Sequence, residues 1–109
     1  MSDIEQIELS LKEAKRLVRL RDAAVKLSSN RDFVLLIQNQ YFVEESARLV
    51  GLLAEPEVRQ HRDEVIEAMH GIANLKAFLR NTIQIGNIAE NEISEYHEAL
   101  DEAHAGDED

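Results

Sequence analysis

Residues 2–27, SDIEQIELSLKEAKRLVRLRDAAVKL, carry the clearest helical signal in the chain. Ser2 and Glu5 have the spacing of a capping box, in which each side chain binds the other residue's backbone N–H. Apolar side chains then recur at steps of three and four on one helix face: Ile4, Ile7, Leu11, Ala14, Val18 and Val25. A second apolar row lies beside the first: Leu17, Leu20, Ala24 and Leu27. We therefore expect a coiled-coil-like first helix about 40 Å long.

Further helices are expected after this one. Ser28-Ser29-Asn30 interrupts the apolar pattern and supplies N-caps for the next segment. The polar residues 38–40 leave open whether that segment is one helix or two short ones. Pro56 favours a new helix start, and the apolar face after it continues to about Ile85. The predicted core lies in the second segment: Phe33, Leu36, Ile37, Tyr41, Phe42, Ala47, Leu49, Val50, Leu52 and Leu53.

Gly86 and Asn87 predict the end of the third helix, and Asn87 with Glu90 has the spacing of another capping box. A last helix then carries a narrow seam of coiled-coil type: Ala89, Ile93, Tyr96, Leu100 and Ala103. No segment alternates with the two-residue period of a strand. The sequence therefore predicts an all-α fold, an elongated helical bundle of about four helices with coiled-coil-like first and last helices. It forms one domain over residues 1–105, followed by a frayed acidic tail over residues 106–109.

The composition is that of a folded globular chain, with 44% apolar and 31% charged residues. Because there is no cysteine, disulfides, thiolate metal sites and cysteine nucleophiles are excluded. The longest apolar run, Phe33–Ile37, is far shorter than the roughly 20 residues that span a bilayer. The acidic start Met1–Glu5 lacks the features of a signal peptide. We therefore expect a cytoplasmic protein without a membrane partner.

The net charge of −10 is concentrated in the second half of the chain. Residues 1–54 hold eight acids and eight bases, whereas residues 55–109 hold fourteen acids and four bases. Residues 90–109 hold nine acids and no base. Such asymmetry is typical of a segment that interacts with a partner. It makes direct nucleic-acid binding by this half unfavourable, because phosphates would be repelled.

Two charged surfaces are the candidate interaction sites. The first helix carries a basic strip, about 10 Å long by helical rise, made of Lys12, Lys15, Arg16 and Arg19. The strip suits the acidic helix of its own chain or of a neighbouring subunit; a nucleic-acid backbone or another acidic protein is the alternative. The last helix combines three seam residues with four carboxylates: Ile93, Tyr96, Leu100, Glu95, Glu98, Asp101 and Glu102. Because negative charge is unfavourable near a helix C-terminus, we expect this helix to be stable only against a partner.

Two patterns contain residue types that bind metals. Glu67 and His70 have the spacing of half of a carboxylate-bridged di-iron site, so a homodimer would have to supply the other half. His97, Asp101 and His104 lie on one side of the last helix and offer ligands for zinc or another transition metal. The first pair lies opposite the apolar stripe, and the trio does not complete a tetrahedron. We therefore interpret both as exposed polar residues and expect no metal or other cofactor.

Enzymatic activity is not expected either. The serines lie in no nucleophile-elbow context, and there is no glycine-rich phosphate loop. With four glycines in 109 residues, a preorganised cleft is difficult to build from loops.

Two segments resemble small bacteriophage-encoded proteins of virion assembly: Arg31–Leu53, with its Tyr41-Phe42 and Glu44-Glu45 pairs, and Leu79–Glu90. The resemblance implies a structural or assembly factor (an adaptor, scaffold or chaperone) located in the host cytoplasm or the virion. A homo-oligomer that binds protein is expected, since two apolar rows on the first helix need two neighbours. Two alternatives remain open. One is an acidic inhibitor that mimics DNA, and the other is a ferritin-like metal-binding bundle.

Overall fold

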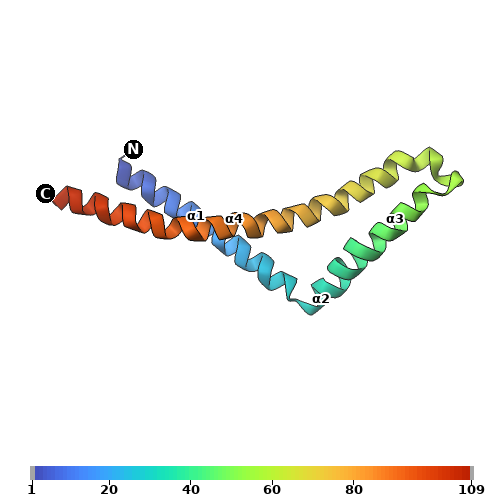
Figure 1. Cartoon of the computed structure of the whole chain (residues 1–109), viewed down its shortest axis with the longest axis horizontal. Helices are drawn as coiled ribbons and strands as arrows, with labels where there is room; N and C mark the ends of the chain where they lie inside the picture. Colours follow the sequence, from blue (N-terminus) through green and yellow to red (C-terminus); the bar gives the residue numbers. More distant parts are fainter. Residues whose placement is uncertain (1, 109) are drawn as a thin grey trace. The chain divides into compact units, whose positions relative to one another are not determined.

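The computed structural model describes residues 2–108, and every regular element in this range is helical. The elements are α1 (Asp3–Ser28), α2 (Arg31–Phe33), η1 (Val34–Glu45), α3 (Ser46–Leu53), η2 (Pro56–His61) and α4 (Arg62–Glu108) (Figure 1). Because α2, η1 and α3 follow one another without a break, the described residues form three long helices: α1, the stretch 31–53, and α4. The all-α prediction is confirmed, whereas the predicted count of about four helices is wrong.

The helix starts follow the local sequence signals. Ser2 Oγ accepts a hydrogen bond from the Glu5 N–H at 3.2 Å, and Asn30 Oδ1 accepts one from the Phe33 N–H at 2.9 Å. Each bond satisfies an N–H group that has no partner within the first turn of a helix. Pro56 opens η2, a 3₁₀ segment that leads directly into α4. The predicted N-caps at Ser2 and Asn30 and the predicted restart at Pro56 are therefore confirmed.

The predicted helix end at Gly86-Asn87 is wrong, because α4 continues through both residues to Glu108. Gly86 is buried against α1, and a Cβ added to it would lie 2.1 Å from the Cβ of Arg21. Glycine costs a helix interior about 1 kcal/mol relative to alanine, but here it permits the close approach of a second helix. Asn87 and Glu90 do not cap a helix, since their side chains accept hydrogen bonds from Arg21.

η1 has the wide hydrogen-bonding pattern of a π-helix, so residues 38–40 do not divide the stretch 31–53. Half-buried side chains of the stretch 31–53 recur every four residues at Phe33, Ile37, Tyr41 and Glu45, and the series continues to the buried Leu49. A four-residue period drifts around an α-helix, which has 3.6 residues per turn. A wider helix keeps these positions closer to one face, which gives a physical reason for the rare π geometry.

The chain divides into two compact units, and α4 contributes to both. Unit 1 joins Met1–Val25 to Asn81–Asp109, and unit 2 is Lys26–Arg80. In unit 1, α1 and the C-terminal part of α4 run antiparallel, with the start of α1 and the end of α4 at the same end of the pair (Figure 1). Their contact buries mainly small side chains: Leu11, Ala14, Ala24 and Ala89.

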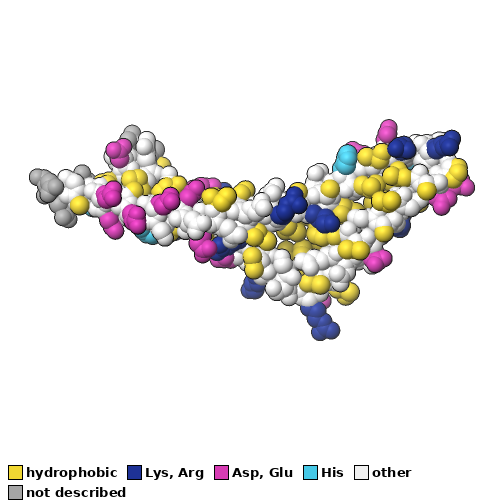
Figure 2. Space-filling view, in the orientation of Figure 1, with side chains coloured by type: hydrophobic (Ala, Val, Ile, Leu, Met, Phe, Trp, Pro, Cys, Tyr) yellow, Lys and Arg dark blue, Asp and Glu magenta, His cyan; other side chains and the backbone are white. Residues whose placement is uncertain are grey.

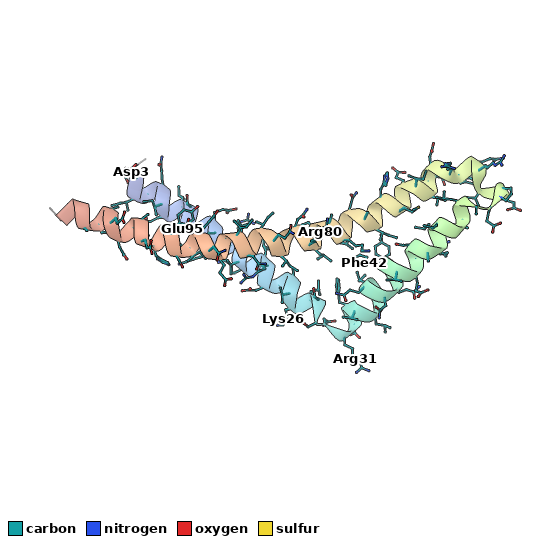
Figure 3. The ribbon with its side chains drawn as sticks, viewed as in Figure 1. Asp3, Lys26, Arg31, Phe42, Arg80 and Glu95 are labelled. Carbon is teal, nitrogen blue, oxygen red and sulfur yellow. The ribbon has the colours of Figure 1, made fainter. Side chains whose placement is uncertain are left out.

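Unit 2 contains an apolar core between the stretch 31–53 and the first part of α4. Leu49, Val65 and Ile72 are buried and are packed by Tyr41, Phe42, Leu52, Leu53, Val58 and Met69. Phe42 points from η1 toward α4 (Figure 3), and Lys76 Nζ lies 5.5 Å from its ring centroid. The segment predicted as the core does contribute to it, but Leu36, Ala47 and Val50 are exposed.

The end of the chain is described only in part. α4 extends to Glu108, and the predicted frayed tail includes Asp109, which lies outside the described residues. Fraying of residues 106–109 stays a prediction. Among residues 2–108, no helix has an apolar stretch long enough to cross a bilayer.

Candidate functional site

Arg21 joins the two helices of unit 1. Its Nη1 donates to Glu90 Oε2 at 2.8 Å and to Asn87 Oδ1 at 3.0 Å, and its Nη2 donates to Glu90 Oε1 at 3.3 Å. Nε and Nη2 also donate to Asp22 Oδ1, at 3.0 and 2.9 Å. The Arg21 side chain is only 12% exposed, whereas its two carboxylate partners are largely exposed. Arg21 is therefore a largely covered cation held between α1 and α4.

These hydrogen bonds change the acid–base behaviour of both helices. The Arg21 guanidinium lowers the pKa of Glu90, first through the hydrogen bonds and then through its charge. The same hydrogen bonds, with those to Asp22, raise the pKa of Arg21. Both groups are consequently charged at neutral pH, as a bidentate arginine–carboxylate pair requires.

The lowered pKa of Glu90 predicts that unit 1 becomes less stable in acid. The Glu90 contribution is complete above the unfolded pKa, near 4.5, and is lost as the pH falls through the lower folded value. We expect the Glu90→Gln variant to lack this part of the pH dependence and to be less stable than the wild type at neutral pH. Urea unfolding from neutral to about pH 3 measures both effects. Glu98→Gln, at an exposed position of the same helix, is the control, and identical profiles for Glu90→Gln and wild type would contradict the prediction.

The predicted seam of the last helix lies on the inner side of α4. Ala89 is buried, and Ile93, Tyr96, Leu100 and Ala103 are half-buried. Tyr96 and Glu92 line an open groove together with α1 residues, among them Ala14 and Leu17. The Tyr96 hydroxyl donates to Glu92 Oε2 at 3.4 Å. The C-terminal part of α4 therefore packs its seam against α1 of the same chain.

The predicted basic strip is exposed on α1 and does not face α4. Arg16 pairs with Glu13 of its own helix at 2.6 Å. For Lys12, Lys15 and Arg19, no ion pair is found with any carboxylate whose side chain the structure describes. The cation that does bind the acidic part of α4 is Arg21, which lies outside the predicted strip.

The predicted acidic residues of the last helix are exposed as well. Figure 2 shows carboxylates gathered over the C-terminal part of α4. Glu95, Glu98, Asp101 and Glu102 are exposed, and none of them forms an ion pair with a described basic side chain. Unpaired carboxylates of this kind are available to a protein partner, and they are equally what a DNA mimic would present.

The candidate metal ligands do not meet in a cluster. Glu67 and His70 are exposed on α4, and so are His97, Asp101 and His104. Within the described part of the chain, no group of three or more histidine, aspartate or glutamate side chains is arranged to hold a metal ion.

Large apolar side chains are exposed along the stretch 31–53. Leu35, Leu36, Val43 and Val50 are 67%, 64%, 58% and 54% exposed, and together we call them the apolar strip. Leu36 also lines an open, mainly apolar groove with Ile37, Gln40, Tyr41 and Glu45. Apolar side chains are visible over the helices of unit 2 in Figure 2. Two residues of the apolar strip, Leu36 and Val50, belong to the predicted core, and their exposure contradicts that prediction.

Sequence reasoning missed Arg21, Gly86 and Glu90 as structural contacts. The signal that was available is the spacing of Gly86 and Ala89, two small residues one helical turn apart in a helix with few glycines. Small residues at this spacing permit close helix packing, but they equally mark a helix end when the facing helix is unknown.

Comparisons with protein-family models, with curated protein sequences and with solved structures find no match for this chain.

Proposed function

We propose that this chain is a non-enzymatic, protein-binding assembly factor that works as a homo-oligomer, the role implied by its resemblance to phage virion-assembly proteins. The observation that carries the proposal is the apolar strip on the stretch 31–53. Single exposed apolar residues are ordinary on protein surfaces, but several along one helical stretch are typical of an interaction surface.

The limited core of each unit supports this interpretation. Each unit consists of about 55 residues, and the buried side chains of unit 2 are Leu49, Val65 and Ile72. A single core of this size supplies at most about 3–5 kcal/mol of stability. Burying one large apolar side chain contributes about 1.5–3 kcal/mol. Covering the apolar strip in an assembly would therefore add a substantial fraction of the stability that each unit has alone.

The strip can be tested by replacing three of its residues with glutamine, in the variant L36Q/V43Q/V50Q. We expect the wild type to self-associate and this variant to associate at least about tenfold more weakly, because the apolar area that drives association is lost. Sedimentation velocity over a range of protein concentrations measures the dissociation constants.

The control for this experiment is N39A/E44A, which changes exposed polar residues on the same stretch and should leave association unchanged. A wild type that stays monomeric at every concentration would overturn the homo-oligomer. An unchanged dissociation constant in L36Q/V43Q/V50Q would remove the apolar strip from the interface.

A further inference from the structure

Two charged stripes on unit 1 have the same spacing and opposite sign. Lys12, Lys15 and Arg19 follow one another on α1 at steps of three and four. Glu95, Glu98 and Glu102 follow one another on α4 at the same steps. Seven residues of helix rise about 10.5 Å, so the two stripes are equally long. We call them the basic stripe and the acidic stripe. The basic stripe is the basic strip without Arg16, which pairs with Glu13.

Within the described part of the chain, neither stripe is neutralised by ion pairs. All six residues are exposed, and no ion pair involving any of them is found among the side chains that the structure describes. α1 already has its cross-helix pair with α4, which is formed by Arg21 and Glu90. The two stripes are therefore complementary surfaces that have no ion-pair partner among the described side chains of one copy.

The helical phase explains why one copy cannot bring its stripes together. On α1 the residues that face α4 include Leu11 and Ala14, and the basic stripe begins about a quarter turn away from them. On α4 the seam residues Ala89 and Ile93 face α1, and the acidic stripe lies on the outer side of the helix. Each stripe therefore faces away from the other helix of the same pair.

We propose that copies of this chain join head to tail, with the basic stripe on α1 of one copy bound to the acidic stripe on α4 of the next. This inference rests on the proposed homo-oligomer and specifies its contact. Because the two stripes lie on opposite outer sides of the α1–α4 pair, each copy offers one basic surface and one acidic surface to two different neighbours. Such a heterologous contact repeats into rings or open chains and does not stop at a symmetric dimer.

The helices of neighbouring copies run antiparallel in this contact. An antiparallel register places Arg19 opposite Glu95 and Lys12 opposite Glu102, with Lys15 one residue out of line with Glu98. It brings the exposed Ile88 opposite Lys26, which lies between the exposed Val25 and Leu27. A parallel register would place Ile88 opposite Glu5, which leaves an apolar side chain against a carboxylate. Exposed ion pairs are individually weak, so the contact is reversible and sensitive to salt.

Charge reversal tests the proposal in two variants, K12E/K15E/R19E and E95K/E98K/E102K. We expect each variant alone to self-associate at least tenfold more weakly than the wild type in sedimentation velocity at low salt. An equimolar mixture of the two should regain the wild-type association, because one variant is acidic on both sides and the other is basic on both sides. Raising the salt from about 50 mM to about 500 mM should weaken the wild type and the mixture alike.

The control variant is R31E/R59E/R62E, which reverses three exposed basic residues of unit 2 and changes the net charge by the same amount as K12E/K15E/R19E. Arg31 projects away from the helices in Figure 3. This control should associate like the wild type. Circular dichroism checks that every variant keeps its helix content, and the single reversals K15E and E98K replace any triple variant that does not.

The outcomes separate this inference from the proposed function. A monomeric wild type overturns both. A wild type that associates while either reversed variant associates equally well overturns only the head-to-tail contact. Failure of two folded reversed variants to associate with each other overturns it as well. Two results together support it. The mixture regains association, and K12E/K15E/R19E added to the wild type shortens the wild-type assemblies, because this variant can occupy only one end of them.

Discussion

The Gly86→Ala variant should be less stable than the wild type, although alanine is the better helix former. A Cβ at this position would lie 2.1 Å from the Cβ of Arg21 and 3.0 Å from the backbone oxygen of Leu17. Neither atom is the end of a flexible side chain, so α1 and α4 have to move apart. Overpacking of this kind costs about 1–3 kcal/mol, which outweighs the gain of up to about 1 kcal/mol from removing a helical glycine.

Gly71→Ala is the matched control on the same helix. The nearest atom to a Cβ at Gly71 is the Tyr41 hydroxyl oxygen at 4.0 Å, so nothing has to move. We expect this variant to be more stable than the wild type by about 0.5–1 kcal/mol. Urea unfolding followed by circular dichroism measures both variants, and hydrogen exchange should localise the loss in Gly86→Ala to unit 1. If Gly86→Ala were as stable as Gly71→Ala, the close helix contact would be wrong.

The Ile72→Ala variant should unfold unit 2 more easily than any exposed apolar substitution does. Ile72 is 3% exposed and packs with Leu49 and Val65 at the centre of the unit 2 core. Truncation of a buried isoleucine costs about 2–5 kcal/mol, because transfer free energy is lost and a cavity remains. A loss of this size is comparable to the total that a core of this size can supply.

Leu35→Ala provides the comparison in the same unit, since it removes a similar volume from a side chain that is 67% exposed. At a protein concentration low enough to keep the chain monomeric, where the apolar strip is uncovered, its stability should stay within about 0.5 kcal/mol of the wild type. Thermal and urea unfolding distinguish the two variants directly. Equal destabilisation by Ile72→Ala and Leu35→Ala would show that the core is not where the structure places it.

The apolar strip shows the limit of periodicity as a guide to burial. The sequence places Phe33, Leu36, Tyr41 and Val50 in one apolar segment, and an α-helical period does not separate the inner residues from the outer ones. The structure separates them: Phe33 and Tyr41 are half-buried, whereas Leu36 and Val50 are exposed. Between these positions η1 has the π-helical pattern, so a regular α-helical period does not hold over the segment. The period of four among the inner residues was readable, but nothing local favours a π-helix over an α-helix.

The candidate interaction residues illustrate the same division. Sequence spacing identified the basic strip and the acidic residues of the last helix, and both lie on the surface. It could not show that Arg21, one turn beyond Leu17, is the cation that α4 binds. α1 carries six basic residues with the same charge, and which of them contacts α4 depends on the position of the facing helix.

The amino-acid sequence by itself determined the helical state of the chain, the capped starts at Ser2 and Asn30, and the restart at Pro56. These features depend on energies within a few residues, such as a side-chain oxygen that accepts a hydrogen bond from a free backbone N–H. Only the tertiary structure decided that Gly86 lies inside a helix and that Asn87 and Glu90 bind Arg21. A glycine is compatible both with the end of a helix and with the close packing of a second helix. Which of the two occurs here depends on residues of α1, more than sixty positions away along the chain.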